Sequence, residues 1–217
     1  MSIRIIIADD HTIVRHGLVK LLQQDGDMEV VAEASNGISA VQLARDLSPE
    51  VVVMDVGMPD LNGIGATEQI LRDNGDIRIL ALSMHSGKKF VASMLKAGAA
   101  GYLLKDCALE ELVQAIRTII EGKIYLSPAI ADVVVTNYVR TTDEGEPSAF
   151  TVLSRREREV LQLMAEGNTT KQIALYLHIS PKTVEGHRLR IMSKLEIDNV
   201  AQLTKYAIQE GLTSPEL

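Results

Sequence analysis

The sequence predicts an α/β domain with a parallel sheet covered by helices on both faces, followed by a small all-α domain of four helices. Between residues 3 and about 121, short apolar runs alternate with segments of helical periodicity, which is typical of βα units. From residue 150 onward the periodicity is helical throughout. The chain has 217 residues, 46% of them hydrophobic and 24% charged, which is enough for two modest globular domains.

Five apolar runs are the predicted strands of the first domain. They cover residues 3–8, 29–34, 51–55, 78–83 and 101–104. Helices are predicted between them because apolar residues recur at i, i+4, i+7 and i+8, so that one face of each helix can pack on the sheet. The two clearest stripes are Val14, Leu18, Leu21 and Leu22, and Leu112, Ile116, Ile119 and Ile120.

The second domain is separated from the first by a polar segment. Residues 126–138 are consistent with a short helix, and residues 141–148 have a composition typical of a flexible linker. We therefore predict a first domain over 1–123, a partly helical linker over 124–149 and a second domain over 150–217. Three helix starts are marked by N-cap residues, at Ser154, Thr169 and Ser180, and a fourth helix is predicted over 200–210.

Composition excludes several classes of protein. A single cysteine, Cys107, allows no internal disulfide, and no Cys/His cluster has the spacing of a zinc site. No stretch approaches the roughly 18 uninterrupted apolar residues of a membrane span, and the N-terminus does not resemble a secretion signal. We expect a cytoplasmic protein with no membrane partner.

The acidic net charge of −7 is unevenly distributed. Residues 1–125 carry 12 Lys and Arg against 17 Asp and Glu, residues 126–150 carry 1 against 4, and residues 151–217 carry 9 against 8. Within the last part, residues 181–195 contain four basic residues and a single acidic residue, Glu185. The basic residues are Lys182, Arg188, Arg190 and Lys194. A locally basic helix is therefore compatible with binding to phosphates despite the net charge.

Polar residues follow the predicted strands at their carboxyl ends, where parallel α/β sheets bind ligands. Asp9 and Asp10 follow the first strand, Asp55 ends the third, Ser83 ends the fourth and Lys105 follows the fifth. Three carboxylates at one rim repel one another, and Mg²⁺ with its preference for oxygen ligands would relieve that repulsion. Individually each of these residues is typical of a turn, a cap or a solvated charge, whereas their order on successive strand ends indicates a site.

The same rim is suited to phosphoryl chemistry. Asp55 would keep one oxygen free to attack phosphorus, and the phosphoryl oxygens would then contact the metal, the Ser83 hydroxyl and Lys105. His11 and His16 are interpreted as surface or packing residues.

The segments VMDVGMPDLNG at 53–63 and YLLK at 102–105, together with Asp9-Asp10, resemble the receiver domain of bacterial two-component response regulators. The resemblance implies a flavodoxin-like fold with strand order 2-1-3-4-5 and phosphoryl transfer from a sensor histidine kinase to Asp55. It also implies a receiver that catalyses its own phosphotransfer and dephosphorylation. The implied metal ligands are Asp10, Asp55, the Gly57 carbonyl and, through water, Asp9. In the implied switch, Ser83 moves onto the phosphoryl group and Tyr102 rotates inward.

The second domain has helix-turn-helix spacing, with helices starting at residues 170 and 181 around a short turn. The second helix has a buried stripe and a narrow basic outer face, which suits the major groove of B-DNA. Few aromatic residues are present for stacking on single strands or RNA. On pattern alone, a helical bundle that contacts proteins is an open alternative.

The segments LSRREREVL at 153–161, KQIA at 171–174 and TVEGHR at 183–188 resemble the LuxR-type DNA-binding domain. A receiver followed by this module is the arrangement of NarL/FixJ-type response regulators. By position, the resemblance implies base readout by Glu185, Gly186 and Leu189, and phosphate contacts by Lys171, Lys182, Thr183, His187, Arg188 and Lys194. Gly186 has no side chain with which to contact a base edge.

The sequence is thus interpreted as a transcription factor controlled by phosphorylation, and not as an enzyme. Expected partners are a sensor histidine kinase, double-stranded promoter DNA, RNA polymerase and, on phosphorylation, a second copy of the chain. A phosphatase of the haloacid dehalogenase type needs a second acid two residues after the nucleophile, and Gly57 stands there. The open alternative is a phosphorylation-independent DNA-binding or adaptor protein whose receiver serves only for protein contacts.

Overall fold

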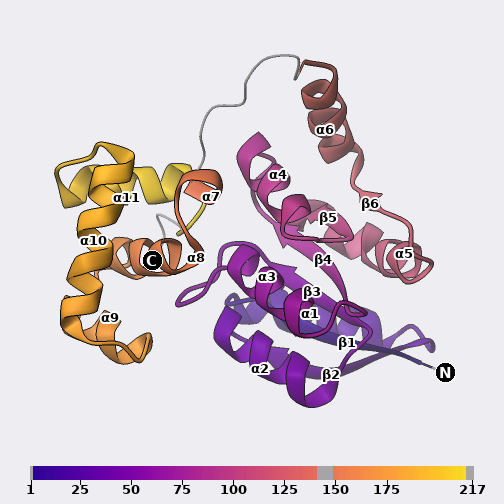
Figure 1. The fold of residues 1–217 in the computed structure, drawn as a ribbon. Helices are drawn as coiled ribbons and strands as arrows, with labels where there is room; N and C mark the ends of the chain where they lie inside the picture. The colour runs from indigo at the N-terminus through magenta and orange to yellow at the C-terminus, as the bar shows by residue number, and fades with distance from the viewer. Residues whose placement is uncertain (1, 141–148, 214–217) are drawn as a thin grey trace. The chain divides into compact units, whose positions relative to one another are not determined.

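The computed structural model describes residues 2–140 and 149–213, which form two compact units. The first unit spans Met1–Glu144 and the second Gly145–Leu217. Each is followed along the colour bar of Figure 1, from indigo through magenta for the first and from orange to yellow for the second. The predicted linker residues 141–148 lie outside the described residues.

The first unit is built on a parallel sheet in the order β2-β1-β3-β4-β5-β6 (Figure 1). Its strands are β1 (Ile3–Ala8), β2 (Met28–Ala34), β3 (Val51–Asp55), β4 (Arg78–Ser83), β5 (Gly101–Leu104) and β6 (Tyr125–Leu126). The predicted fold class and the order of the first five strands are confirmed. The sixth strand has only two residues, too few to give a periodic pattern in the sequence.

Five helices connect or follow the first five strands of this sheet. They are α1 (Thr12–Gln23), α2 (Gly37–Leu47), α3 (Gly63–Asp73), α4 (Lys88–Lys96) and α5 (Ala108–Ile120), with a 3₁₀ turn, η1 (Lys105–Cys107), before α5. Leu18 of α1 and Ile116 of α5 share one hydrophobic core with Ile5 and Ile7 of β1. Because side chains alternate along a strand, Ile6 faces the opposite layer, where α2 contacts α3 and α3 contacts α4.

A further helix, α6 (Pro128–Arg140), follows β6 and agrees with the short helix predicted after residue 126. Proline stands at its first position, where the missing N–H of proline leaves no hydrogen bond unmade.

The second unit consists of helices around a separate hydrophobic core. They are α7 (Ala149–Val152), α8 (Arg155–Ala165), α9 (Thr170–Tyr176), α10 (Pro181–Leu195) and α11 (Val200–Gln209). The three predicted N-caps are confirmed, because the side chains of Ser154, Thr169 and Ser180 each accept a hydrogen bond from the backbone N–H three residues later. Val160, Val184 and Leu203 place α8, α10 and α11 in one core.

Within residues 2–140 and 149–213, no helix combines the length and the apolar composition that crossing a bilayer requires.

Candidate functional site

The acidic rim predicted at the strand ends is a buried pocket in the first unit. Because β3 lies between β1 and β4 in the sheet, the end of β1 is brought beside Asp55, and β4 places Ser83 next to it. Lys105, directly after β5, extends to the same point: its Nζ lies 2.9 Å from Asp9 Oδ2 and 2.8 Å from Asp55 Oδ2. Asp9, Asp55 and Ser83 are all buried, so these charges meet away from bulk water.

The environment of Asp55 opposes its ionisation. The pKa of Asp55 is raised from 3.8 to about 6. Burial is the main cause and the Asp9 carboxylate acts in the same direction, whereas Lys105 acts to lower the pKa. For Lys105, burial alone would lower the pKa, but the carboxylates of Asp55 and Asp9 outweigh burial and raise it. The pocket therefore combines a charged lysine with carboxylates that one ammonium group does not fully compensate.

The residues of the pocket fit a divalent cation. One side-chain ligand atom from each of Asp9, Asp10, His11 and Asp55 lies within 4.8 Å of the others. In an octahedral Mg²⁺ site the ion lies about 2.0–2.1 Å from each ligand atom, so the ligand atoms are about 3 to 4 Å from one another. Asp10 Oδ1 is buried and accepts no hydrogen bond, which leaves it available as a ligand.

The loop after Asp55 is fixed by close packing with the start of α3. The Gly57 N–H donates to Asp55 Oδ1 at 3.3 Å. A Cβ at Gly63 would lie 2.0 Å from the main-chain oxygen of Asp55, so only glycine permits this approach. Asn62 caps α3 by accepting from the Gly65 N–H at 2.9 Å. This packing positions the Asp55–Gly57 segment at the rim.

Ser83 and Tyr102 lie on neighbouring strands beside the pocket. Ser83 Oγ accepts from the His85 N–H at 3.0 Å. Tyr102 is fully buried, and its hydroxyl donates to the His85 carbonyl oxygen at 2.7 Å. Burial raises the pKa of Tyr102 to about 12. Tyr102 is therefore held inside the protein by burial and by its bond to the loop that follows β4.

His11 is exposed, as expected for a surface residue, but it also lies beside the acidic side chains of the pocket, which sequence reasoning did not predict. Its Nδ1 lies 2.8 Å from Asp10 Oδ1 and 3.3 Å from Asp9 Oδ1. The available signal was its place directly after two acids at a strand end. His16, one turn into α1, is exposed and is not one of the clustered residues.

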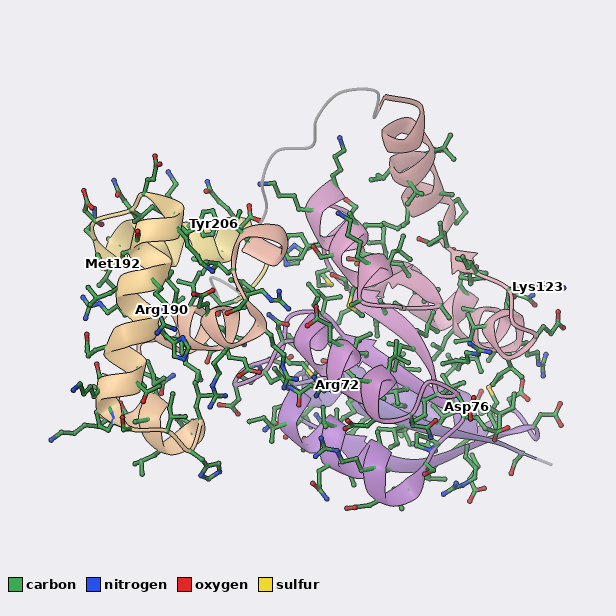
Figure 2. The ribbon with its side chains drawn as sticks, in the orientation of Figure 1. Arg72, Asp76, Lys123, Arg190, Met192 and Tyr206 are labelled. Atoms are coloured by element: carbon green, nitrogen blue, oxygen red, sulfur yellow. The ribbon has the colours of Figure 1, made fainter. Side chains whose placement is uncertain are left out.

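A second candidate surface is the outer face of α10. Val184 and Ile191 are buried, whereas Lys182, Glu185, Leu189 and Arg190 are exposed. Figure 2 marks Arg190 and Met192 on this helix. A Cβ added at Gly186 would meet no atom within 4 Å, so the surface is open at that point.

Several of the predicted DNA contacts have side-chain partners within α10 or on a neighbouring helix. Glu185 Oε1 accepts from the Thr170 hydroxyl of α9 at 2.8 Å, and Arg188 Nη1 lies 3.9 Å from Glu185 Oε2. Lys194 Nζ donates to Glu157 Oε2 of α8 at 2.7 Å.

The remaining predicted contacts differ in exposure. Lys171, Lys182 and Thr183 are exposed, whereas the Nδ1 atom of His187 is buried and has no hydrogen-bond partner. The exposed basic groups of this surface therefore come from both α9 and α10.

Two family models match the chain. The model described as response regulator receiver domain matches residues 5–117, and the model described as bacterial regulatory proteins, luxR family, matches residues 151–207. Together they cover the acidic pocket and α10.

Full-length relatives are similar over nearly the whole chain. Oxygen regulatory protein NreC of Staphylococcus carnosus is 38% identical over 213 residues, which are 96% of this chain and 98% of the relative. Response regulator UvrY of Escherichia coli K12 is 37% identical over 214 residues, 99% of this chain and 97% of the relative.

Solved structures are similar as well. The RcsB response regulator of Salmonella typhimurium has a TM-score of 0.67 at 28% identity, over 96% of this chain and 98% of RcsB. A complex of RcsB with DNA has a TM-score of 0.61 at 28% identity, over 97% and 99% of the two chains.

Proposed function

Since this chain belongs to the response regulators that join a receiver domain to a LuxR-type DNA-binding domain and regulate transcription, we propose that a phosphoryl group on Asp55 controls its binding to DNA. The observation that carries the proposal is the convergence of Asp55, Asp9 and Lys105 within hydrogen-bonding distance in one buried pocket.

The proposed reaction is transfer of a phosphoryl group from a phosphohistidine of a sensor kinase. A carboxylate oxygen of Asp55 attacks phosphorus, so that a P–O bond forms while the P–N bond to the imidazole breaks, and the released nitrogen takes a proton from solvent. Lys105 and the Ser83 hydroxyl would bind two of the phosphoryl oxygens. The proximity of Lys105 to Asp55 supports this role, because the ammonium group already lies at the reacting carboxylate.

The pocket's acidic side chains are proposed to hold the metal that such transfer requires. Asp10, Asp55, the Gly57 carbonyl and, through water, Asp9 would hold Mg²⁺, which supplies positive charge opposite the phosphoryl oxygens. The buried, unbonded Oδ1 of Asp10 supports this assignment.

The proposed output is binding of α10 in the major groove of promoter DNA in the cytoplasm. Glu185, Gly186 and Leu189 would face the bases. Lys171, Lys182, Thr183, His187, Arg188 and Lys194 would contact or orient toward phosphates. Phosphorylation would favour a homodimer that binds paired half-sites and contacts RNA polymerase. The structure of RcsB bound to DNA supports the choice of duplex DNA as the ligand.

The test is incubation of the full-length protein with Mg²⁺ and acetyl phosphate, followed by intact mass measurement. We expect the mass of one phosphoryl group on the wild type and on Asp76→Asn, and none on Asp55→Asn. Asp76, labelled in Figure 2, is a matched control because it is exposed and precedes β4, whereas Ser83 is the last residue of that strand. Equal incorporation into Asp55→Asn would contradict the proposal.

A further inference from the structure

We infer that His11 is an additional ligand of the cation in the acidic pocket, and that its nitrogen shifts the ion preference of the pocket from Mg²⁺ toward divalent transition metals such as Mn²⁺ and Co²⁺. This inference rests on the proposed function, because it concerns the same pocket. It goes further by naming a nitrogen donor and the class of ion that such a donor selects.

The ring nitrogen of His11 lies at ligand spacing from the carboxylates of the pocket. His11 Nδ1 lies 2.8 Å from Asp10 Oδ1, 3.3 Å from Asp9 Oδ1 and 4.0 Å from Asp55 Oδ2. Around one octahedral ion with ligands at about 2.1 Å, adjacent ligands are about 3 Å apart and opposite ligands about 4 Å apart. Asp10 and Asp55 are the proposed direct ligands: the distance to Asp10 Oδ1 matches adjacent positions, and the distance to Asp55 Oδ2 matches opposite positions.

His11 Nδ1 and Asp10 Oδ1 lie close together without a hydrogen bond between them. Asp10 Oδ1 is buried and accepts no hydrogen bond, although His11 Nδ1 is only 2.8 Å away. The two atoms are thus close without the alignment of a donor and an acceptor. Two ligands of one ion have this arrangement, since both direct lone pairs at a common centre rather than at each other.

A backbone hydrogen bond holds His11 at the rim of the pocket. The His11 N–H donates to Asp9 Oδ1 at 2.8 Å, which ties the residue to the acidic cluster before its side chain is considered. His11 is also the N-cap residue of α1 and makes no side-chain cap hydrogen bond, so its ring is not used to begin the helix. With 53% of the side chain exposed, the ring lies at the mouth of the pocket, where an ion enters.

The chemistry of the donor determines which ion benefits. Mg²⁺ strongly prefers oxygen ligands, whereas an imidazole nitrogen is a favourable ligand for first-row transition metals. We expect His11→Ala to weaken Co²⁺ binding about tenfold and to change Mg²⁺ binding less than about twofold. A residue that contributed only charge or packing would change the affinities for both ions to a similar extent.

The experiment uses the metal-free full-length protein with Mn²⁺ as the spectroscopic probe. Pulsed electron paramagnetic resonance detects ¹⁴N coordinated directly to Mn²⁺, and competition between Co²⁺ and Mg²⁺ gives the ratio of affinities. We expect the ¹⁴N signal in the wild type and in His16→Ala, and its loss in His11→Ala. His16→Ala is the matched control because it removes an exposed imidazole from α1, the helix that directly follows His11.

The outcomes separate this inference from the proposed function. Mn²⁺ binding that Asp10→Asn abolishes, but that gives no ¹⁴N signal in the wild type, would overturn the role of His11 and leave the acidic metal site in place. A ¹⁴N signal that persists in His11→Ala would also overturn it. Mn²⁺ affinity that is unchanged by Asp10→Asn would overturn both the role of His11 and the proposed metal site.

Discussion

Asp55 of the first unit and Glu157 of the second are both buried carboxylates paired with lysine, yet their environments act in opposite directions. Each is 3% exposed, and the lysine nitrogen lies 2.8 Å from Asp55 and 2.7 Å from Glu157. Burial and the Asp9 carboxylate together outweigh Lys105 and raise the pKa of Asp55 to about 6. Burial also acts to raise the pKa of Glu157, but hydrogen bonds from Lys194 and Ser154 outweigh it and lower the pKa to about 2.

The difference is in what surrounds each carboxylate. Glu157 closes a capping box, in which Ser154 donates to Glu157 Oε2 from both its N–H and its hydroxyl. With Lys194, three donors therefore stabilise the anion. Asp55 shares its lysine with Asp9. The Glu157 anion therefore stabilises the fold. The Asp55 anion is in an unfavourable environment, which a bound cation or phosphorylation would relieve.

The largest expected change in stability comes from replacing the lysine that pairs with each carboxylate. In metal-free buffer at neutral pH, Lys105→Met should lower the stability of the first unit by about 4 kcal/mol, because Asp9 and Asp55 would be left buried without compensation. Lys194→Met should lower the stability of the second unit by only about 1 kcal/mol, because this lysine is partly exposed and Ser154 still donates to Glu157. Differential scanning calorimetry measures both, and equal losses would remove the distinction.

A smaller effect is expected from Glu157→Gln. The folded-state pKa of Glu157 is below the unfolded value, so its contribution is complete above about pH 4.5 and is lost as the pH falls toward 2. At pH 7 we expect Glu157→Gln to lower stability by about 2 kcal/mol, less than the full linkage value because glutamine keeps one acceptor. Urea unfolding between pH 7 and 2.5 measures this, and a wild-type loss no steeper than that of the variant would contradict it.

The smallest expected change is a gain in stability. Asp55→Asn should stabilise the metal-free first unit by about 1 kcal/mol, because it removes a buried charge beside Asp9 while Lys105 keeps one acidic partner. The same calorimetric measurement applies. A loss of stability in Asp55→Asn would show that Asp55 is a structural anion like Glu157.

Sequence reasoning predicted what depends on local order or on a regular topology. The caps at Ser154, Thr169 and Ser180 involve residues three apart, so the chain itself places donor and acceptor together. The meeting of Asp55 with Lys105 was predictable because the carboxyl ends of parallel strands share one edge of the sheet.

Contacts without a repeating pattern were not predictable. The ion pair of Lys194 with Glu157 joins helices 37 residues apart, and the bond from Thr170 to Glu185 depends on the turn between α9 and α10. The position of the His11 ring depends on the backbone turn after Asp9. Such contacts are set by tertiary packing, which no local motif or hydrophobic period reveals.

The central claim is that phosphorylation of Asp55 changes the affinity of α10 for DNA. The direct measurement is the Kd of full-length protein, before and after phosphorylation, for a duplex selected from a random-sequence library by the phosphorylated wild type. We expect phosphorylation to lower the Kd at least about tenfold, since dimerisation adds a second set of contacts, and to leave Asp55→Asn unchanged. An unchanged Kd for wild-type protein whose mass includes the phosphoryl group would contradict the claim.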